Sequence, residues 1–178
     1  MYLLPQQIPG AKCQKNYRDR MVGACYFSTM EITGSVHSIL DQKGKTVWSI
    51  PPDATVFEAI QFMSNKNIGA IAVAKDGKLV GMLSERDYTR KVVLAGRSSR
   101  ETRVEEIMTT PAVTATPHDS VVNCMRRMTE RKVRHLPVVD GEAMVGVISI
   151  GDLVNWTINA QAAAIEQLEN YVTGGTYQ

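Results

Sequence analysis

Cysteine is scarce in this sequence, and none of it lies in a paired motif. The 178 residues include Cys13, Cys25 and Cys124, and no two of them form a C-x-x-C pair. An odd number of unpaired cysteines argues against a disulfide framework. We therefore expect three reduced thiols, with Cys124 a small core residue on the buried face of a helix.

Long apolar runs are missing as well. No run approaches the roughly 18 to 20 residues of a membrane span, and no signal-peptide core precedes a small-residue cleavage site near the N-terminus. These absences favour a cytoplasmic protein without a membrane segment. An organellar transit peptide is the alternative, because residues 1–34 hold four basic residues and only two acidic ones.

The chain also lacks an excess of charge of either sign. Twenty Lys and Arg against 18 Asp and Glu leave a net charge of +2, too small to predict nucleic-acid binding. The densest basic stretch is RRMTERKVR, residues 126–134, which contains no aromatic residue for base stacking. We interpret it as a solvated helix face with some ligand-facing arginines, and we do not expect a nucleic-acid partner.

Patterns typical of catalysis or metal binding are absent too. His37, His118 and His135 lie far apart, and no acid or cysteine recurs with ligand spacing. No Ser-His-Asp or Cys-His set emerges from the motifs. We expect a protein that is not an enzyme, binds no metal and requires no cofactor.

What the sequence does contain is an internal repeat at an offset of 65 residues. Identical residues recur at this offset without a gap: Val56 and Val121, Met63 and Met128, Val73 and Val138, Gly81 and Gly146, Ser84 and Ser149, Asp87 and Asp152. A repeat of this kind indicates one supersecondary unit present twice.

Each copy follows the same order of local patterns. A β-prone run (46–50, 112–116) precedes a helical pattern, then a hairpin (Asp76-Gly77, Asp140-Gly141), then a helix that starts near Ser84 or Ser149. The first helical pattern opens with the capping box Thr55-x-x-Glu58. The order is strand, helix, strand, strand, helix, which predicts an α/β (α+β) fold.

Two such units should pack together around a pseudo-twofold axis, because one small sheet with helices on one side cannot bury its apolar face alone. We expect residues 1–34 to be an extension outside the repeats. Residues 35–111 form the first repeat with its polar connector, GRSSRETR (96–103). Residues 112–178 form the second repeat with a long C-terminal helix.

Two copies of an apolar strand that ends in Gly-h-h-Ser-x-x-Asp, with RHLPVVD in the second, resemble the tandem cystathionine-beta-synthase (CBS) domain pair, or Bateman module. The resemblance covers about residues 35–172. The segments ERDYTRKVV, GRSS, VEEIMT and SIGDLV are similar to small stand-alone CBS-pair proteins of bacteria and plant organelles. The resemblance to the CBS pair implies regulation by an adenosine-containing ligand, such as AMP, ADP, ATP, NAD or S-adenosylmethionine, in the cleft between the repeats.

The repeated Ser-x-x-Asp has two interpretations that the sequence leaves open. Ser at the N-cap with an acid three residues later caps a helix, so structure alone could require it. The resemblance implies instead that Asp87 and Asp152 hold a ribose, while Ser84 and Ser149 lie toward the phosphate at a helix N-terminus.

The resemblance also suggests the remaining contacts of the ligand. Arg134 and His135, just before Leu136, would face phosphates, and so would Arg86 on the helix after the first Ser-x-x-Asp. The adenine would lie between the first and second strands of a repeat. Its candidate contacts, each of which could equally be plain core, are Ile50, Ala70 and Ile71 in the first copy and Ala115, Val133 and Leu136 in the second.

The function we favour is a non-catalytic adenine-nucleotide sensor that passes its ligand state to an unidentified protein target. The alternative is a constitutive dimeric interaction protein with degenerate clefts. Intact Asp87 and Asp152 favour the sensor. The helical stretch 151–172 carries more apolar residues than one small subdomain needs to cover, which indicates a homodimer.

Overall fold

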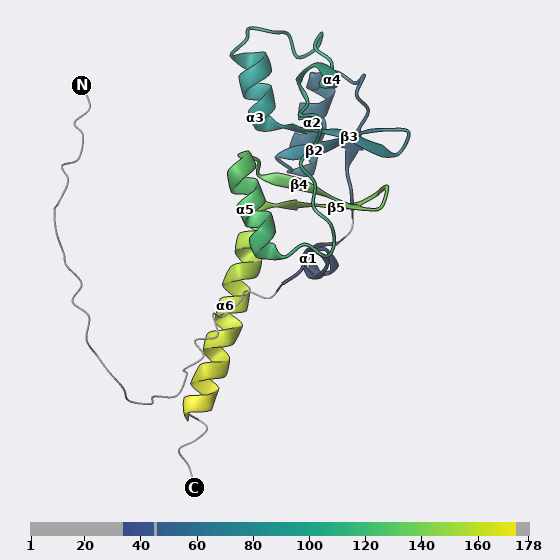
Figure 1. The fold of residues 1–178 in the computed structure, drawn as a ribbon. Helices are drawn as coiled ribbons and strands as arrows, with labels where there is room; N and C mark the ends of the chain where they lie inside the picture. Colours follow the sequence, from purple (N-terminus) through teal and green to yellow (C-terminus); the bar gives the residue numbers. More distant parts are fainter. Residues whose placement is uncertain (1–33, 45, 174–178) are drawn as a thin grey trace, which may run out of the picture. The chain divides into compact units, whose positions relative to one another are not determined.

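The computed structural model describes residues 34–44 and 46–173. The expectations for the N-terminal extension, Cys13 and Cys25 lie outside these residues. The helices are α1 (Val36–Lys43), α2 (Val56–Lys66), α3 (Glu85–Tyr88), α4 (Val104–Ile107), α5 (Val121–Arg131) and α6 (Ile150–Thr173), and a π-helical segment, η1 (Thr89–Val93), follows α3. The strands are β1 (Ser49–Ile50), β2 (Ala70–Lys75), β3 (Lys78–Ser84), β4 (His135–Asp140) and β5 (Ala143–Ser149) (Figure 1). The predicted mixed α/β class is confirmed.

The first long helix of each repeat begins and ends at residues that the repeat duplicates. At the start of α2, the Thr55 hydroxyl accepts the Glu58 N–H at 3.2 Å, and the Glu58 carboxylate accepts the Thr55 N–H at 2.8 Å. At the start of α5 the Ser120 hydroxyl likewise accepts the Asn123 N–H, at 3.2 Å, without a side chain that bonds back. Both helices stop at a left-handed residue, Asn67 with φ 52° and Lys132 with φ 56°. The predicted capping box is therefore confirmed, and the same turn ends both helices.

The first hairpin has the turn that its sequence predicts. Lys75 pairs with Lys78, so Asp76 and Gly77 form a two-residue turn in which both have positive φ, 51° and 76°. Positive φ at both positions is the type I′ geometry that suits a tight hairpin.

The second hairpin differs from the prediction by one residue. Asp140 pairs with Ala143, so the turn is Gly141-Glu142 rather than Asp140-Gly141. Gly141, with φ 60°, takes the place that Asp76 has in the first repeat. A glycine at the first turn position fits a type II′ turn, which explains why the shift is tolerated.

The first strand of each repeat is much shorter than predicted. Of the described residues in these two predicted strands, Ser49 and Ile50 pair with β2, and Ala115 bridges to β4 at Val138, both in the parallel sense. Prolines follow within two residues in both copies and cannot donate to a strand ladder. The result is a three-stranded sheet, β1-β2-β3, and a two-stranded sheet, β4-β5.

Two short helices, α1 and α4, were missed at the level of sequence. Each of them packs into the core of one repeat and leads along the chain into the other, an arrangement that we call the exchange. Helix α1 precedes the first strand of the first repeat, yet its Val36, Ile39 and Leu40 lie in the core of the second repeat. Helix α4 precedes the second repeat, yet its Val104 and Ile107 lie in the core of the first. Each core is therefore completed by the segment that leads into the other repeat.

This exchange explains the duplicated glycines, Gly81 and Gly146. A Cβ on Gly146 would lie 2.5 Å from Leu40 Cδ2 of α1. A Cβ on Gly81 would lie 2.8 Å from Met108 Sδ and 3.0 Å from the Thr109 carbonyl, just after α4. Both strands need glycine because the exchanged segment presses against the backbone at that point.

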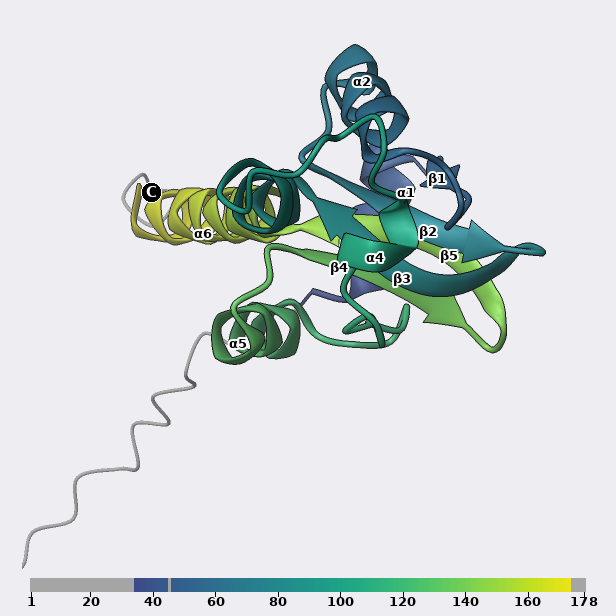
Figure 2. The same ribbon diagram turned by 90° about the horizontal axis from the view of Figure 1, so that it is seen from above.

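The two sheets meet along strands β3 and β5 (Figure 2). A small apolar cluster with members from both repeats fills the contact, including Ala72, Leu79 and Met82 from the first repeat and Met144 and Val147 from the second. Leu79 and Met82 are related to Met144 and Val147 by the 65-residue offset, as a pseudo-twofold arrangement requires. Helices α2 and α5 lie on opposite sides of the two sheets.

Helix α6 begins in the second core and runs well past the sheets (Figure 1). Leu153 near its start is fully buried, whereas Ile158, Ile165 and Leu168 are 57%, 55% and 60% exposed. Among the described helices, none combines the length and the hydropathy that crossing a membrane would require.

Candidate functional site

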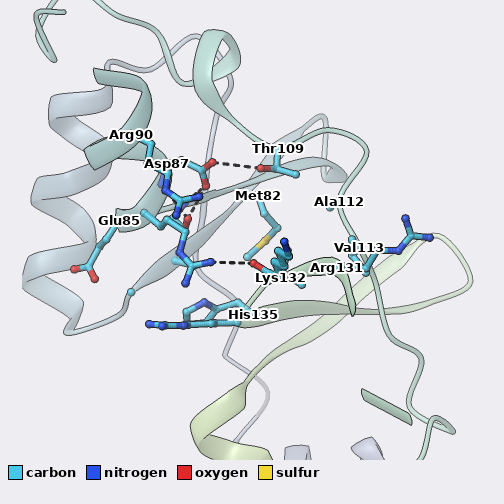
Figure 3. A pocket seen from close by; sticks show the side chains of 16 residues that line it. Met82, Glu85, Asp87, Arg90, Thr109, Ala112, Val113, Arg131, Lys132 and His135 are labelled. Atoms are coloured by element: carbon cyan, nitrogen blue, oxygen red, sulfur yellow. Dashed lines mark hydrogen bonds between the residues drawn. The ribbon is translucent and has the colours of Figure 1, made fainter. Parts of the chain in front are cut away.

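A pocket of about 440 Å³ lies where the end of β3 and the start of α3 face the segment between α5 and β4. The first repeat and its connector contribute Gly69, Ala70, Met82, Ser84, Glu85, Arg86, Asp87, Arg90 and Thr109 to its lining, and the second repeat contributes Ala112, Val113, Arg131, Lys132, Val133, Arg134 and His135. We call this pocket the first cleft. Figure 3 shows Asp87 and Thr109 on one side of it and Lys132 and His135 on another.

Ser84 and Asp87 form a capping box at the start of α3. The Ser84 hydroxyl and N–H donate to Asp87 Oδ2 at 2.5 and 3.1 Å, and the Asp87 N–H donates back to the Ser84 hydroxyl at 3.3 Å. The other carboxylate oxygen, Oδ1, accepts a weak bond from the Thr109 hydroxyl at 3.4 Å and pairs with Lys91 at 2.9 Å. The cap therefore holds Asp87 Oδ2 in place, and it thereby fixes the orientation of Oδ1.

The rim of the first cleft is rich in cations. Five of its lining residues are basic (Arg86, Arg90, Arg131, Lys132, Arg134), whereas two are acidic (Glu85, Asp87). The Arg86 guanidinium spans the cleft and donates to the Lys132 carbonyl at 3.0 Å. An excess of cations around a concave site attracts an anionic ligand.

The apolar wall of the first cleft comes from the contact between the sheets. Met82 of β3, Ala112 and Val113 line this wall, and Ala70 and Val133 complete it. One pocket thus combines an apolar slot, a carboxylate and a cluster of cations, which is the set of groups that a nucleotide needs.

His135 lies between two pockets and lines both of them. Burial, helped by Lys43 and Arg134 and opposed by Asp152, lowers the pKa of His135 below its ordinary value of 6.5. The ring is therefore neutral at pH 7. Of the residues expected to face phosphates, His135 therefore offers a hydrogen bond and not a charge.

A second pocket of about 400 Å³ occupies the pseudo-symmetric position, and we call it the second cleft. It is lined by Lys43, Gly44, Thr46, Trp48, Asn67, Ile68, Gly69, Ala70, His135, Val147 and Ser149. Several of these correspond by the 65-residue offset to lining residues of the first cleft, as Asn67 does to Lys132 and Ser149 to Ser84.

Asp152 forms the same cap as Asp87 but has a different partner. The Ser149 N–H and hydroxyl donate to Asp152 Oδ2 at 2.7 and 2.8 Å, and Lys43 Nζ lies 2.6 Å from the same oxygen. Burial alone would raise the pKa of this carboxyl, but the bonds from Lys43 and Ser149 outweigh it and lower the pKa below 3.8. Asp152 is thus a charged, internally paired group.

Four of the predicted adenine contacts lie in the cores instead of on the pocket walls. Ile50 and Ile71 belong to the core of the first repeat, and Ala115 and Leu136 to that of the second. The alternative interpretation given above, that these four residues are ordinary core residues, agrees with their positions. Ala70 and Val133 are the predicted apolar residues that do line the first cleft.

Several residues of the first cleft were missed at the level of sequence. Arg90 was not among the candidates, and Arg131 and Lys132 were interpreted as members of a solvated basic stretch, yet all three line the pocket. For Arg131 and Lys132 the sequence signal was the end of the helix at Lys132, because both residues lie where the chain turns and both line the first cleft. Thr109 had no signal, because the exchanged segment that carries it was not recognised.

Cys124 behaves as predicted. It is fully buried in the second core, and its thiol is free. Burial, with Asp119 nearby, raises its pKa to about 11. The thiol therefore stays protonated and takes no part in the site.

Known proteins share both the sequence and the fold. The mitochondrial CBS domain-containing protein CBSX3 of Arabidopsis thaliana is 36% identical over 151 residues, 79% of this chain and 73% of that protein. A protein with CBS domains from Burkholderia ambifaria MC40-6, assigned to signal transduction, is 45% identical with a TM-score of 0.69, and the match covers 71% of this chain and 95% of that one. The CBS domain pair of MJ0100, solved with 5′-methylthioadenosine and S-adenosyl-L-methionine, is 25% identical with a TM-score of 0.61, covering 68% and 94%.

The family model described as CBS domain matches twice, at residues 44–94 and 104–159. These two matches follow the internal repeat, and the capped Ser-x-x-Asp ends of β3 and β5 fall inside them. The chain therefore belongs to the CBS-domain family, as a regulatory tandem CBS pair.

Proposed function

We propose that the chain is a non-catalytic sensor that binds an adenine nucleotide (AMP, ADP, ATP or NAD) in the first cleft and signals its ligand state to a partner protein. The observation that carries this proposal is the composition of the first cleft, where Asp87, the cation rim and an apolar wall line one pocket. The solved pair MJ0100 holds adenosine-containing ligands, which supports an adenosine ligand here.

Each part of the nucleotide has a matching group in the first cleft. The ribose diol would donate to Asp87 Oδ1, replacing the long Thr109 bond of 3.4 Å and sharing this oxygen with Lys91, which lies 2.9 Å away. The phosphates would lie at the N-terminus of α3 near Arg86 and Arg134, with neutral His135 as a hydrogen-bond donor. The adenine would pack against Met82, whose flexible side chain suits a flat ring.

Titration calorimetry with ATP, AMP and NAD tests this function. Replacing Asp87 with Asn removes a charge-assisted acceptor for the ribose, worth about 1.5–3 kcal/mol. We expect the Asp87→Asn protein to bind about 10- to 100-fold more weakly. Asp140→Asn, on the exposed hairpin edge, is the matched control and should bind like the wild type.

The alternative is a constitutive interaction protein, and two observations favour it: both Ser-x-x-Asp pairs serve as helix caps, and both aspartates already pair with a lysine. A scaffold of this kind would bind none of the three nucleotides and would show no rise of melting temperature with them. Equal binding by the wild type and Asp87→Asn would likewise remove the proposed role of Asp87.

We propose that the protein works as a homodimer in the cytoplasm. The exposed apolar side chains of α6 support the dimer, because a row of such residues on one helix is typical of a contact surface. The mitochondrial location of CBSX3 makes an organelle the alternative compartment. Nucleic acid is not proposed as a partner, because Arg131, Lys132 and Arg134 line the first cleft.

A further inference from the structure

The two clefts present the repeated carboxylates, Asp87 and Asp152, in different ways. Asp87 is part of the lining of the first cleft. Asp152, its counterpart at the 65-residue offset, is not part of the lining of the second cleft, whereas Lys43 is. The second cleft therefore offers a lysine where the first offers a carboxylate.

Lys43 is held in this position by two acceptors of the second repeat. Its Nζ lies 2.6 Å from Asp152 Oδ2 and donates to the Val147 carbonyl at 3.3 Å. The same Asp152 oxygen accepts the N–H and hydroxyl of Ser149. The ammonium thus neutralises the Asp152 carboxylate at its capped oxygen, and Lys43 lines the second cleft where Asp152 does not.

The carboxylate of the first cleft also has a lysine partner, Lys91, but the geometry differs. Lys91 lies on the same helical segment as Asp87, four residues later, and its Nζ also donates to the Ile107 carbonyl at 2.6 Å. Lys91 does not line the first cleft. Lys91 pairs with Oδ1 from the side of Ile107, and Asp87 itself remains part of the cleft lining.

The exchange of α1 explains how Lys43 reaches Asp152. Lys43 is the last residue of α1, which is anchored in the second core by Leu40 and its neighbours. Gly44, with φ 92°, then turns the chain back to the first repeat. The packing of α1 against the second core thus places the Lys43 ammonium beside Asp152 in the folded protein.

We propose that Lys43 occupies the ribose position of the second cleft, so that the chain binds one adenine nucleotide, in the first cleft only. This inference rests on the proposed function of the first cleft. Lys43 thereby sets the number of ligands per chain, and the second cleft opens only when Lys43 leaves Asp152.

Calorimetric titration with ATP tests the inference through the stoichiometry. We expect one ATP per chain for the wild type and two for Lys43→Met, which removes the charge but keeps the length of the side chain. Adding Asp152→Asn to Lys43→Met should remove the extra site again. Lys78→Met is the matched control, because Lys78 also forms an ion pair between the repeats, with Glu142 at 2.7 Å, but lines neither cleft.

The fluorescence of Trp48 gives a second readout that identifies the cleft. Trp48 lines the second cleft and not the first, and the chain has one other tryptophan, Trp156, which packs against the second core. A base that enters the second cleft should quench Trp48 by stacking. We expect ATP to quench Lys43→Met but not the wild type, and Trp48→Phe in the Lys43→Met protein should abolish the change.

The outcomes separate this inference from the proposed function. Two ATP per wild-type chain, or no additional ATP in a folded Lys43→Met protein, would overturn the role of Lys43. If the wild type binds none and Lys43→Met binds one in the second cleft, the role of Lys43 holds and the function proposed for the first cleft fails. If Lys43→Met melts early, Lys43→Gln gives the same test.

Discussion

The exchange of α1 predicts that Gly146 cannot be replaced even by alanine without loss of stability. A Cβ at this position would lie 2.5 and 2.9 Å from the two methyl carbons of Leu40. Overpacking of this kind costs about 1–3 kcal/mol, and the lower chain entropy of alanine returns about 0.5–1 kcal/mol. We expect Gly146→Ala to lower the free energy of unfolding by about 1–2 kcal/mol, which corresponds to a melting temperature about 3–6 °C lower.

Chemical denaturation of a double-mutant cycle measures whether Leu40 is the cause. Leu40→Ala alone should cost about 2–5 kcal/mol, because it leaves a cavity in the second core. In that background the Cβ of Gly146→Ala has room, so the second substitution should cost nothing further. Gly151→Ala is the matched control: its Cβ meets only Ser149 Oγ, at 3.6 Å, and the helical alanine should add about 0.5–1 kcal/mol. Wild-type stability of Gly146→Ala, or additive effects in the cycle, would refute the packing of α1 against β5.

Two further predictions concern the dimer and the acid stability of the fold. Ile165→Glu places a charge on the exposed apolar side of α6, so light scattering should find a monomer. Ala163→Glu, on another side of the helix, is the control and should keep the dimer. A dimeric Ile165→Glu protein would exclude this surface as the dimer contact. Asp119 is partly buried, which would raise its pKa, but the bonds from Arg127 and from the Thr116 N–H outweigh burial and lower it below 3.8. Because the folded pKa is the lower one, this stabilisation is complete above the unfolded pKa and is lost as pH falls through the folded value. Denaturation between pH 7 and 3 should therefore show a steeper acid loss for the wild type than for Asp119→Asn, and parallel curves would contradict the assignment.

Local signals in the sequence predicted most of the secondary structure. Thr55 and Glu58 cap α2 as expected, and Asp76-Gly77 forms the expected turn, because caps and two-residue turns depend on a few adjacent residues. The turn at Gly141-Glu142 shows the limit of such signals. Asp140-Gly141 has the same letters as the first turn, but the pairing of the strands moves the turn by one residue.

The exchange of α1 and α4 could not be predicted in the same way. The spacing of Val36, Ile39 and Leu40 is typical of a buried helix face, but it does not say which of two similar cores the face will enter. The choice depends on tertiary packing against Gly146, more than 100 residues away. The position of Lys43 beside Asp152 follows from that choice and was hidden for the same reason.

The polar lining of the first cleft could be expected from the sequence, and its apolar lining less well. Asp87, Arg86, Arg134 and His135 do line the first cleft, because the repeated motif marks the end of a strand and the start of a helix. Apolar residues have no comparable motif that distinguishes a pocket wall from a core. Ile71 and Leu136 are as hydrophobic as any wall residue, yet they point into the cores and are buried there.

A crystal structure of the protein with ATP measures the central claim most directly. We predict one nucleotide per chain in the first cleft, with its ribose hydroxyls within hydrogen-bond distance of the Asp87 carboxylate and its phosphates beside Arg86 or Arg134. Lys43 should still pair with Asp152 in the same crystal. A first cleft that stays empty at saturating ATP, or a nucleotide whose ribose lies away from Asp87, would contradict it.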